Sequence, residues 1–293
     1  MSTVVEVDGV VRRFGRMTAL DEVSFSLRAN TIYGLLGRNG AGKSTLMQIM
    51  NGHLLATSGR VAVLGESPWE RAAVRARMCL VRENQLYPDQ FRVHHALRAA
   101  SFLFPGWDEA YAQSLVDDFQ LPRSRQVKKL SRGMLTAVGI VIGLASRAPL
   151  TFFDEPYVGL DAVARQLFYD RLLADYAEHP RTIVLSTHLI DEVANLVEHV
   201  LLLDRGRLIV DDDADHLRGA VTAITGPAAA VDRIAASGTE LHRATVGTLT
   251  RATLRGLDDA ARGTAAELGV TLEPLSLQQA IVSLTANGME GSR

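Results

Sequence analysis

The stretch GRNGAGKST, residues 37–45, constrains the fold more than any other part of this 293-residue chain. It carries the spacing Gly37-x-x-x-x-Gly42-Lys43-Ser44, after the apolar run TIYGLL and before a segment that can form a helix, KSTLMQIM. Glycines let the backbone curl so that successive N–H groups converge, and a helix N-terminus adds positive charge at the same point. The pattern therefore predicts a phosphate-binding loop (P-loop) between a buried strand and a helix of an α/β fold.

Lysine is rare in this chain, which makes its place in the P-loop informative. Only three of the 31 basic residues are lysines, at positions 43, 128 and 129. A compact ammonium group fits beside the β- and γ-phosphates of a nucleotide, whereas the planar fork of an arginine would crowd the loop. We expect Lys43 to bind phosphate and the Ser44 hydroxyl to bind Mg²⁺. The other residues expected to line the nucleotide are Gly37, Arg38, Asn39, Gly40, Ala41, Gly42 and Thr45.

The composition is that of a soluble globular protein, with 47% hydrophobic and 22% charged residues. The formal net charge of −2 provides no basic field, so we expect no nucleic-acid partner. A single cysteine, Cys79, excludes an intrachain disulfide and suits a reducing cytosol. The N-terminus has no signal-peptide core, and no stretch reaches the roughly 18 apolar residues of a membrane span. We therefore expect a cytoplasmic protein that something else must hold at any membrane.

Apolar patterning divides the chain into a large and a small domain, which we place at residues 1–218 and 219–293. In the first, strands are expected at 4–11, 23–27, 31–36, 60–64, 150–153 and 182–185, with a hairpin over 200–210 and mostly helices over 90–145. After an acidic stretch at 211–215 the runs become shorter. Their order, strand–helix–strand–strand–helix–strand and a last helix, predicts a small ferredoxin-like α+β domain.

The apolar run LTFF, residues 150–153, ends in two carboxylates, Asp154 and Glu155. A P-loop needs an acid at a strand end to hold Mg²⁺, and we assign that role to Asp154. Glu155 is then placed to polarise the attacking water as a general base. Acids at a strand end can also cap a following helix. Downstream of a P-loop and a buried strand, the catalytic interpretation is favoured.

Four further patterns each have an ordinary explanation when taken alone. LSRGM, residues 130–134, opens an apolar helix for which Ser131 is a natural N-cap. His188 follows the apolar run TIVL and could be a surface residue, and Asp161 ends the triplet GLD after the catalytic acids. Phe14, in RRFG, could belong to the core.

Taken in order with the P-loop and the acids, these motifs resemble those of ATP-binding-cassette (ABC) ATPases over residues 1 to about 215. The resemblance implies an α/β P-loop ATPase domain with an antiparallel β subdomain and a helical subdomain, and it implies ATP with Mg²⁺ as ligands. LSRGM resembles the family's signature motif, whose residues Ser131, Arg132 and Gly133 would contact ATP held by a second subunit. By the same resemblance His188 is the catalytic switch histidine, Asp161 lies in the D-loop and Phe14 stacks on adenine.

Two segments depart from the family pattern. The signature segment reads LSRGM instead of LSGGQ, so that Met134 replaces the glutamine. The segment LVRENQLYP, residues 80–88, resembles the family's Q-loop, which senses Mg²⁺ and contacts the membrane subunit. Arg82 stands at the position of the expected glutamine. Glu83 or Gln85 could take over its role, and the sequence does not choose between them.

The resemblance implies the ATP-hydrolysing subunit of an ABC transporter, peripheral on the inner face of the cell membrane. Its partners would be a second ATP-binding subunit, identical or not, and a separate transmembrane permease. The stretch FPGWDEAYAQSL, residues 104–115, resembles the helical subdomain of bacterial drug and antibiotic exporters, which favours export.

The alternative is a soluble ABC-type ATPase that acts on nucleic acid or ribosomes. DNA-repair members insert a long coiled coil between the P-loop and the signature segment, whereas residues 46–129 show no sustained heptad. Translation factors of this type carry two cassettes in one chain, and this sequence shows one. The transported molecule and the role of residues 219–293 are left open, because no nucleotide motif falls in that region.

Overall fold

The computed structural model describes residues 2–69 and 71–290. The chain forms two compact units, one made of Met1–His188 with Leu196–Asp211 and one made of Leu189–Asn195 with Asp212–Arg293. The second unit thus begins before residue 219 and includes a segment that directly follows His188 in the chain. That residues 1–218 and 219–293 are separate domains stays a prediction.

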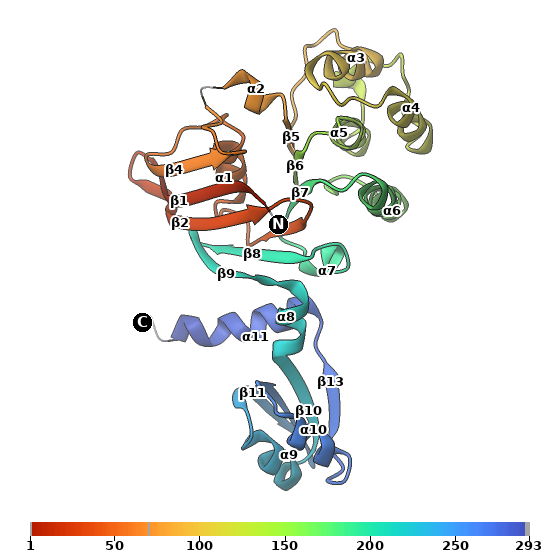
Figure 1. The fold of residues 1–293 in the computed structure, drawn as a ribbon. Helices are drawn as coiled ribbons and strands as arrows, with labels where there is room; N and C mark the ends of the chain where they lie inside the picture. Colours follow the sequence, from red (N-terminus) through yellow and green to blue (C-terminus); the bar gives the residue numbers. More distant parts are fainter. Residues whose placement is uncertain (1, 70, 291–293) are drawn as a thin grey trace. The chain divides into compact units, whose positions relative to one another are not determined.

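A six-stranded sheet of mainly parallel strands organises the first unit (Figure 1). Its order is β5-β6-β7-β3-β8-β9, and the pairs from β5 through β8 are parallel. The strands are β3 (Ile32–Leu36), β5 (Met78–Val81), β6 (Leu150–Asp154), β7 (Thr182–Thr187), β8 (His199–Asp204) and β9 (Arg207–Asp213). Every residue of β3, β6 and β7 is buried, as their continuous apolar runs predict. Because these three strands are neighbours and parallel, the segments that follow them start at the same edge of the sheet.

An antiparallel sheet of three strands lies beside the parallel one, in the order β2-β1-β4. Its strands are β1 (Thr3–Phe14), β2 (Met17–Arg28) and β4 (Ser58–Val63). Helix α1 (Lys43–Met50) packs between the two sheets, since one hydrophobic cluster joins Leu46 and Met47 to residues of both. The antiparallel subdomain and the strand–loop–helix arrangement around the P-loop are therefore confirmed.

Helices occupy the segment that we expected to be helical. Within residues 90–145 they are α3 (Val93–Leu103), α4 (Glu109–Asp118), a 3₁₀ turn (Val127–Lys129) and α5 (Arg132–Ala145). Helix α2 (Ala72–Arg75) precedes this segment, and α6 (Ala162–Glu178) follows β6. Helix α5 begins after Ser131 and buries Val138, Ile140 and Val141, which fits a core helix. Within residues 2–69 and 71–290, none of the helices has the length and apolar character needed to span a bilayer.

The hairpin expected over residues 200–210 is present as β8 and β9. Its turn residues Arg205 and Gly206 have φ of 47° and 82°. Two successive residues with positive φ form a type I′ turn, whose twist matches that of the flanking strands. The prediction is confirmed.

The second unit contains a four-stranded antiparallel sheet in the order β11-β12-β10-β13. Its elements are α7 (Ile190–Val193), α8 (Ala214–Ala220), β10 (Val221–Pro227), α9 (Ala228–Ala235), β11 (Thr239–Val246), β12 (Leu249–Arg255), α10 (Asp259–Ala265), β13 (Thr271–Pro274) and α11 (Leu277–Glu290) (Figure 1). One face of the sheet packs on α9 and α10, and the other packs on α11. The order β10-α9-β11-β12-α10-β13 is the predicted ferredoxin-like topology.

Candidate nucleotide-binding and hydrolysis site

The P-loop backbone takes a path that needs its glycines. Gly37, Gly40 and Gly42 have φ of 148°, 81° and 107°, values that residues with a side chain rarely adopt. A Cβ atom on Gly37 would lie 2.4 Å from the Leu203 carbonyl oxygen, and one on Gly42 would lie 2.6 Å from that of Ala19. The loop is therefore wrapped tightly between β3 and α1.

Lys43 is the first residue of α1 and is only 5% exposed. Its Nζ donates to the carbonyl oxygens of Gly37, at 2.8 Å, and Arg38, at 3.3 Å, so the side chain folds back over the loop. Gly42 caps the helix without a side-chain acceptor. A helix start without a side-chain acceptor, together with a buried ammonium group, suits an anionic ligand.

Asp154 ends β6 and Glu155 directly follows it; both are 7% exposed. Asp154 accepts a hydrogen bond from the Ser186 hydroxyl at 2.7 Å. Glu155 has a φ of 50°, and such left-handed conformations of residues other than glycine cluster at active sites. Its Oε1 lies 3.4 Å from Nζ of Lys43. The next helix, α6, is capped by Asp161, so the alternative that the two acids cap a helix is wrong.

His188 reaches the same carboxylate from the end of β7. Its Nδ1 lies 3.1 Å and 3.0 Å from the two Glu155 oxygens. Three segments far apart in the sequence thus bring Lys43, Glu155 and His188 together. The parallel strand order explains this convergence, since β3, β6 and β7 are neighbours.

Tyr157 also contacts Glu155, and none of the sequence motifs points to it. Its buried hydroxyl donates to Glu155 Oε2 and meets Thr187 Oγ1. Burial and the hydrogen bond to Glu155 raise the pKa of Tyr157, so the phenol keeps its proton. The motif spacing gives no signal for this contact, because it depends on how the loop after Glu155 folds back.

The signature segment lies at the start of α5, where the Ser131 hydroxyl accepts from the Met134 N–H at 3.2 Å. Gly133 packs against the loop that leads to Asp161, because a Cβ atom there would lie 2.4 Å from the Gly159 carbonyl oxygen. Ser131, Arg132 and Asp161 are exposed. Their described side-chain contacts run to neighbouring segments, including Glu83 for Arg132, and not to the P-loop.

Phe14 is the last residue of β1 and is 41% exposed. The Arg12 guanidinium lies 4.4 Å from its ring centroid. Phe14 is therefore not a core residue, and one of the two explanations considered for it is wrong. Its contact with adenine stays a prediction.

The Q-loop segment follows β5 and borders the strand-end acids. Arg82, Glu83 and Gln85 line a small pocket together with Asp154 and Glu155. Glu83 forms an ion pair with Arg132, whereas Arg82 is exposed. All three residues line the pocket, so which of them takes the role of the expected Q-loop glutamine stays a prediction.

Comparison with known proteins identifies the family. The ABC transporter family profile matches residues 20–158. An uncharacterized ABC transporter ATP-binding protein of Methanocaldococcus jannaschii is 30% identical over 216 residues, 71% of this chain and 77% of that protein. The Nod factor export ATP-binding protein I of Mesorhizobium japonicum is 34% identical over 72% of this chain and 64% of that protein. The daunorubicin resistance ATP-binding protein DrrA3 of Streptomyces coeruleorubidus is 29% identical over 74% and 70%.

Solved structures agree with these relatives. An ATP-binding subunit of an ABC transporter superimposes with a TM-score of 0.67 at 25% identity, over 74% of this chain and 92% of that one. The ATP-binding cassette MJ1267 superimposes with a TM-score of 0.63 at 21% identity and shows the fold alone. Fold, motif order and relatives point to one family, and this chain is an ATP-binding, ATP-hydrolysing member of the ABC transporter family.

Proposed function

We propose that this chain powers export through a separate transmembrane permease, by hydrolysing ATP held between two ATP-binding subunits at the inner face of the membrane. The observation that carries the proposal is the convergence of Lys43 and His188 on the Glu155 carboxylate. The relative named for Nod factor export supports the direction of transport, and the relatives named for daunorubicin resistance and lantibiotic transport are consistent with it.

Lys43 is the residue that we assign to the phosphates. Its present partners are two loop carbonyls and one carboxylate, all within 3.4 Å. Phosphate oxygens carry more negative charge than the carbonyls and bind a point charge without fixed geometry. ATP therefore competes for the ammonium group and releases Glu155 from it.

Ser44 and Asp154 are the residues that we assign to Mg²⁺. Ser44 is exposed in the first turn of α1, and Asp154 carries a buried carboxylate at the end of β6. No cluster of three or more potential protein ligands occurs in the described part of the chain. One carboxylate and one hydroxyl nevertheless fit Mg²⁺, which keeps several waters and binds substrate phosphates. When bound, the ion would neutralise charge on the phosphates.

Glu155 is the residue that we assign as the general base. Its buried carboxylate lies within hydrogen-bond distance of His188, which restricts its orientation. Once Lys43 turns to phosphate, one carboxylate oxygen is free to accept a proton from the attacking water. His188 then holds the other oxygen.

The signature residues Ser131, Arg132 and Gly133 are assigned to the ATP of a second subunit. They start α5, a helix of 14 residues, and its N-terminus carries partial positive charge. Ser131 and Arg132 are exposed, so this end is open to another molecule. Asp161, at the next exposed helix start, would lie at the same subunit interface, and Phe14 would stack on adenine.

The permease is assigned to a groove beside the Q-loop segment. This cavity of about 540 Å³ lies between β5 and the helices, and its walls include Leu80, Ala100, Leu103 and Ile142. Gln85 also lines this cavity. An apolar groove next to the hydrolysis site fits a helix with one apolar face, the usual way in which a helix docks into a groove.

Glu155→Gln tests the catalytic part of the proposal. The amide keeps the shape of the side chain and removes the base, so we expect ATP binding to be retained and turnover to fall by about 100-fold or more. Turnover close to that of the unmodified chain would contradict the role of Glu155.

Sedimentation tests the transport part. The chain should sediment with membranes when the permease is co-expressed and stay in the supernatant without it. Sedimentation with ribosomes or nucleic acid instead would support the soluble alternative.

A further inference from the structure

Tyr157 lies in the loop that connects the catalytic acids to α6 and is only 3% exposed. This loop turns back on itself, with hydrogen bonds from Val158 N–H to the Glu155 carbonyl and from Leu160 N–H to the Tyr157 carbonyl, both 3.1 Å. The turn places the phenol hydroxyl against the carboxylate of Glu155, two residues earlier in the chain. A buried tyrosine is thus fixed directly on the general base.

The direction of the hydrogen bonds can be worked out from the groups involved. An ionised carboxylate only accepts hydrogen bonds, so the single hydroxyl proton of Tyr157 goes to Glu155 Oε2. The hydroxyl of Thr187, which is fully buried, then donates to the Tyr157 oxygen. The result is a chain of two donors, Thr187 to Tyr157 to Glu155, that joins the ends of β7 and β6.

This hydrogen-bond chain from Thr187 through Tyr157 to Glu155 differs from the other contacts of the Glu155 carboxylate. Lys43 and His188 face the carboxylate as well, but both already have assigned roles in nucleotide binding or hydrolysis. Asp154, Arg82 and Glu83 border the same pocket, and the Arg165 guanidinium lies 5.7 Å from the Tyr157 ring centroid. Among these residues, Tyr157 and Thr187 are the neutral hydrogen-bond donors. The ends of β6 and β7 are also joined by the hydrogen bond from Glu155 N–H to the Ser186 carbonyl at 3.2 Å.

We propose that Tyr157, held by Thr187, is a positioning residue that fixes the Glu155 carboxylate in the orientation required to take a proton from water. The assignment rests on the proposed role of Glu155 as the general base. When Lys43 turns to phosphate, Glu155 loses one of its contacts, and His188 and Tyr157 remain as its described side-chain partners. The hydroxyl of Tyr157 stays on Oε2, so Oε1 keeps facing the nucleotide. Misplacement of a catalytic group by about 1 Å costs up to about 100-fold in rate, so such a restraint matters.

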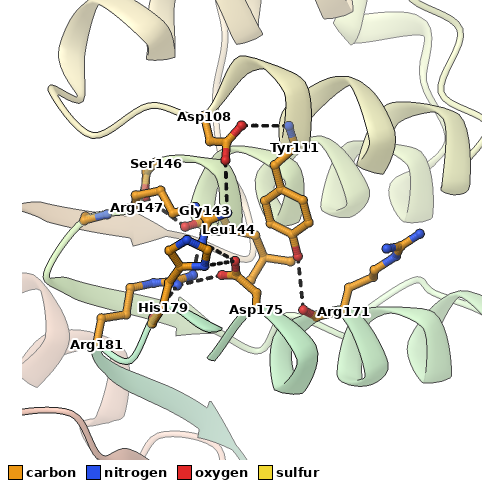
Figure 2. Close-up of polar contacts among 11 residues, drawn as sticks. Asp108, Tyr111, Gly143, Leu144, Ser146, Arg147, Arg171, Asp175, His179 and Arg181 are labelled. Carbon is orange, nitrogen blue, oxygen red and sulfur yellow. Dashed lines mark hydrogen bonds and ion pairs between the residues drawn. The ribbon is translucent and has the colours of Figure 1, made fainter. Parts of the chain in front are cut away.

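Tyr157→Phe removes the hydroxyl and keeps the ring. We expect kcat per ATP-binding site to fall about 10-fold and the KM for ATP to change less than about twofold, because the described hydrogen bonds of the Tyr157 hydroxyl go to Glu155 and Thr187. Tyr111→Phe is the matched control. It removes a hydroxyl that donates to the Arg171 carbonyl at 3.0 Å in the helical part, and it should leave kcat within about twofold (Figure 2). Equal kcat values for the two variants would overturn the proposal.

A pair of substitutions at Thr187 gives a second test that does not depend on the folding of Tyr157→Phe. Thr187→Ser keeps the donor and should keep most of the activity, whereas Thr187→Val keeps the shape and should be several-fold slower. Equal rates of the serine and valine variants would overturn the proposal.

A double variant separates this proposal from the role of Glu155. If Tyr157 acts through Glu155, adding Tyr157→Phe to Glu155→Gln should not lower the residual turnover further. A further 10-fold loss in that background would overturn the proposal. Normal turnover by Glu155→Gln alone would instead remove the general base on which the assignment rests.

Discussion

Asp175→Asn should destabilise the first unit strongly, because Asp175 is the anion of a buried ion cluster. Its side chain is 2% exposed and forms ion pairs with Nη1 of Arg147 at 2.5 Å and with Nη1 of Arg181 at 2.6 Å. Arg147 also binds Asp108 at 3.0 Å (Figure 2). The four residues balance two positive and two negative charges. The substitution leaves one guanidinium charge without an anion.

The expected size of the effect follows from burial. Arg181 is 5% exposed, so water cannot replace the lost carboxylate. Removing one partner of a buried ion pair costs about 3–5 kcal/mol of unfolding free energy. For a unit of this size each kcal/mol corresponds to about 2–4 °C, so the melting temperature should fall by roughly 6–20 °C.

Thermal and urea unfolding of the full chain would measure this loss. Asp170→Asn on the same helix is the matched control, since Asp170 is exposed, and it should change stability by less than about 0.5 kcal/mol. Adding Arg181→Met to Asp175→Asn should recover part of the loss, because it removes the unpaired cation. A loss below about 1 kcal/mol in Asp175→Asn, or a double variant less stable than the single one, would show that Asp175 is not the anion that stabilises this buried cluster.

Three further predictions concern other parts of the chain. Lys43→Ala should abolish ATP binding or hydrolysis, and Lys43→Arg should also be poor because the fork does not fit the loop; near-normal ATPase activity of either would contradict the P-loop assignment. Burial raises the pKa of Cys79 to about 12, so its thiol should react with a thiol reagent at pH 8 at least about 100-fold more slowly in the folded chain than in denaturant. Because the buried Cys79 thiol resists ionisation, its ionisation does not lower the free energy of unfolding below about pH 9, the ordinary thiol pKa. The free energy of unfolding should fall as the pH rises from there towards 12. A chain ending at residue 218 should still bind ATP, because every nucleotide motif precedes that point; a soluble truncated chain that does not bind would contradict the proposed domain boundary.

Much of the site could be predicted because its parts are encoded locally. The P-loop glycines serve a backbone path that few other residues can take, and Gly37 and Gly42 lie against neighbouring carbonyls. Strands β3, β6 and β7 are short, continuous apolar runs, which indicate burial on both faces. Once these strands are parallel neighbours, the residues that follow them must converge, as Glu155 and His188 do.

The rest depends on tertiary contacts that leave no local pattern. Tyr157 reaches Glu155 only through the turn that follows β6. Asp175, Arg147 and Arg181 would each be taken for solvated charges in the sequence, and they are buried because they meet one another. Helix α7 belongs to the second unit although it begins two residues after His188, and its short sequence carries no sign of this.

The most direct test of the account is the mixing of two defective chains. Lys43→Ala lacks a P-loop lysine but keeps its signature segment, and Ser131→Arg keeps its P-loop but blocks the signature segment. In a symmetric homodimer that shares ATP across its interface, a mixed dimer contains one complete site. Each variant alone should be inactive, and an equal mixture should regain roughly a quarter of the ATPase activity, since half of the dimers are mixed and each has one site of two. Activity of the mixture no higher than that of the separate variants would contradict ATP sharing between two copies of this chain.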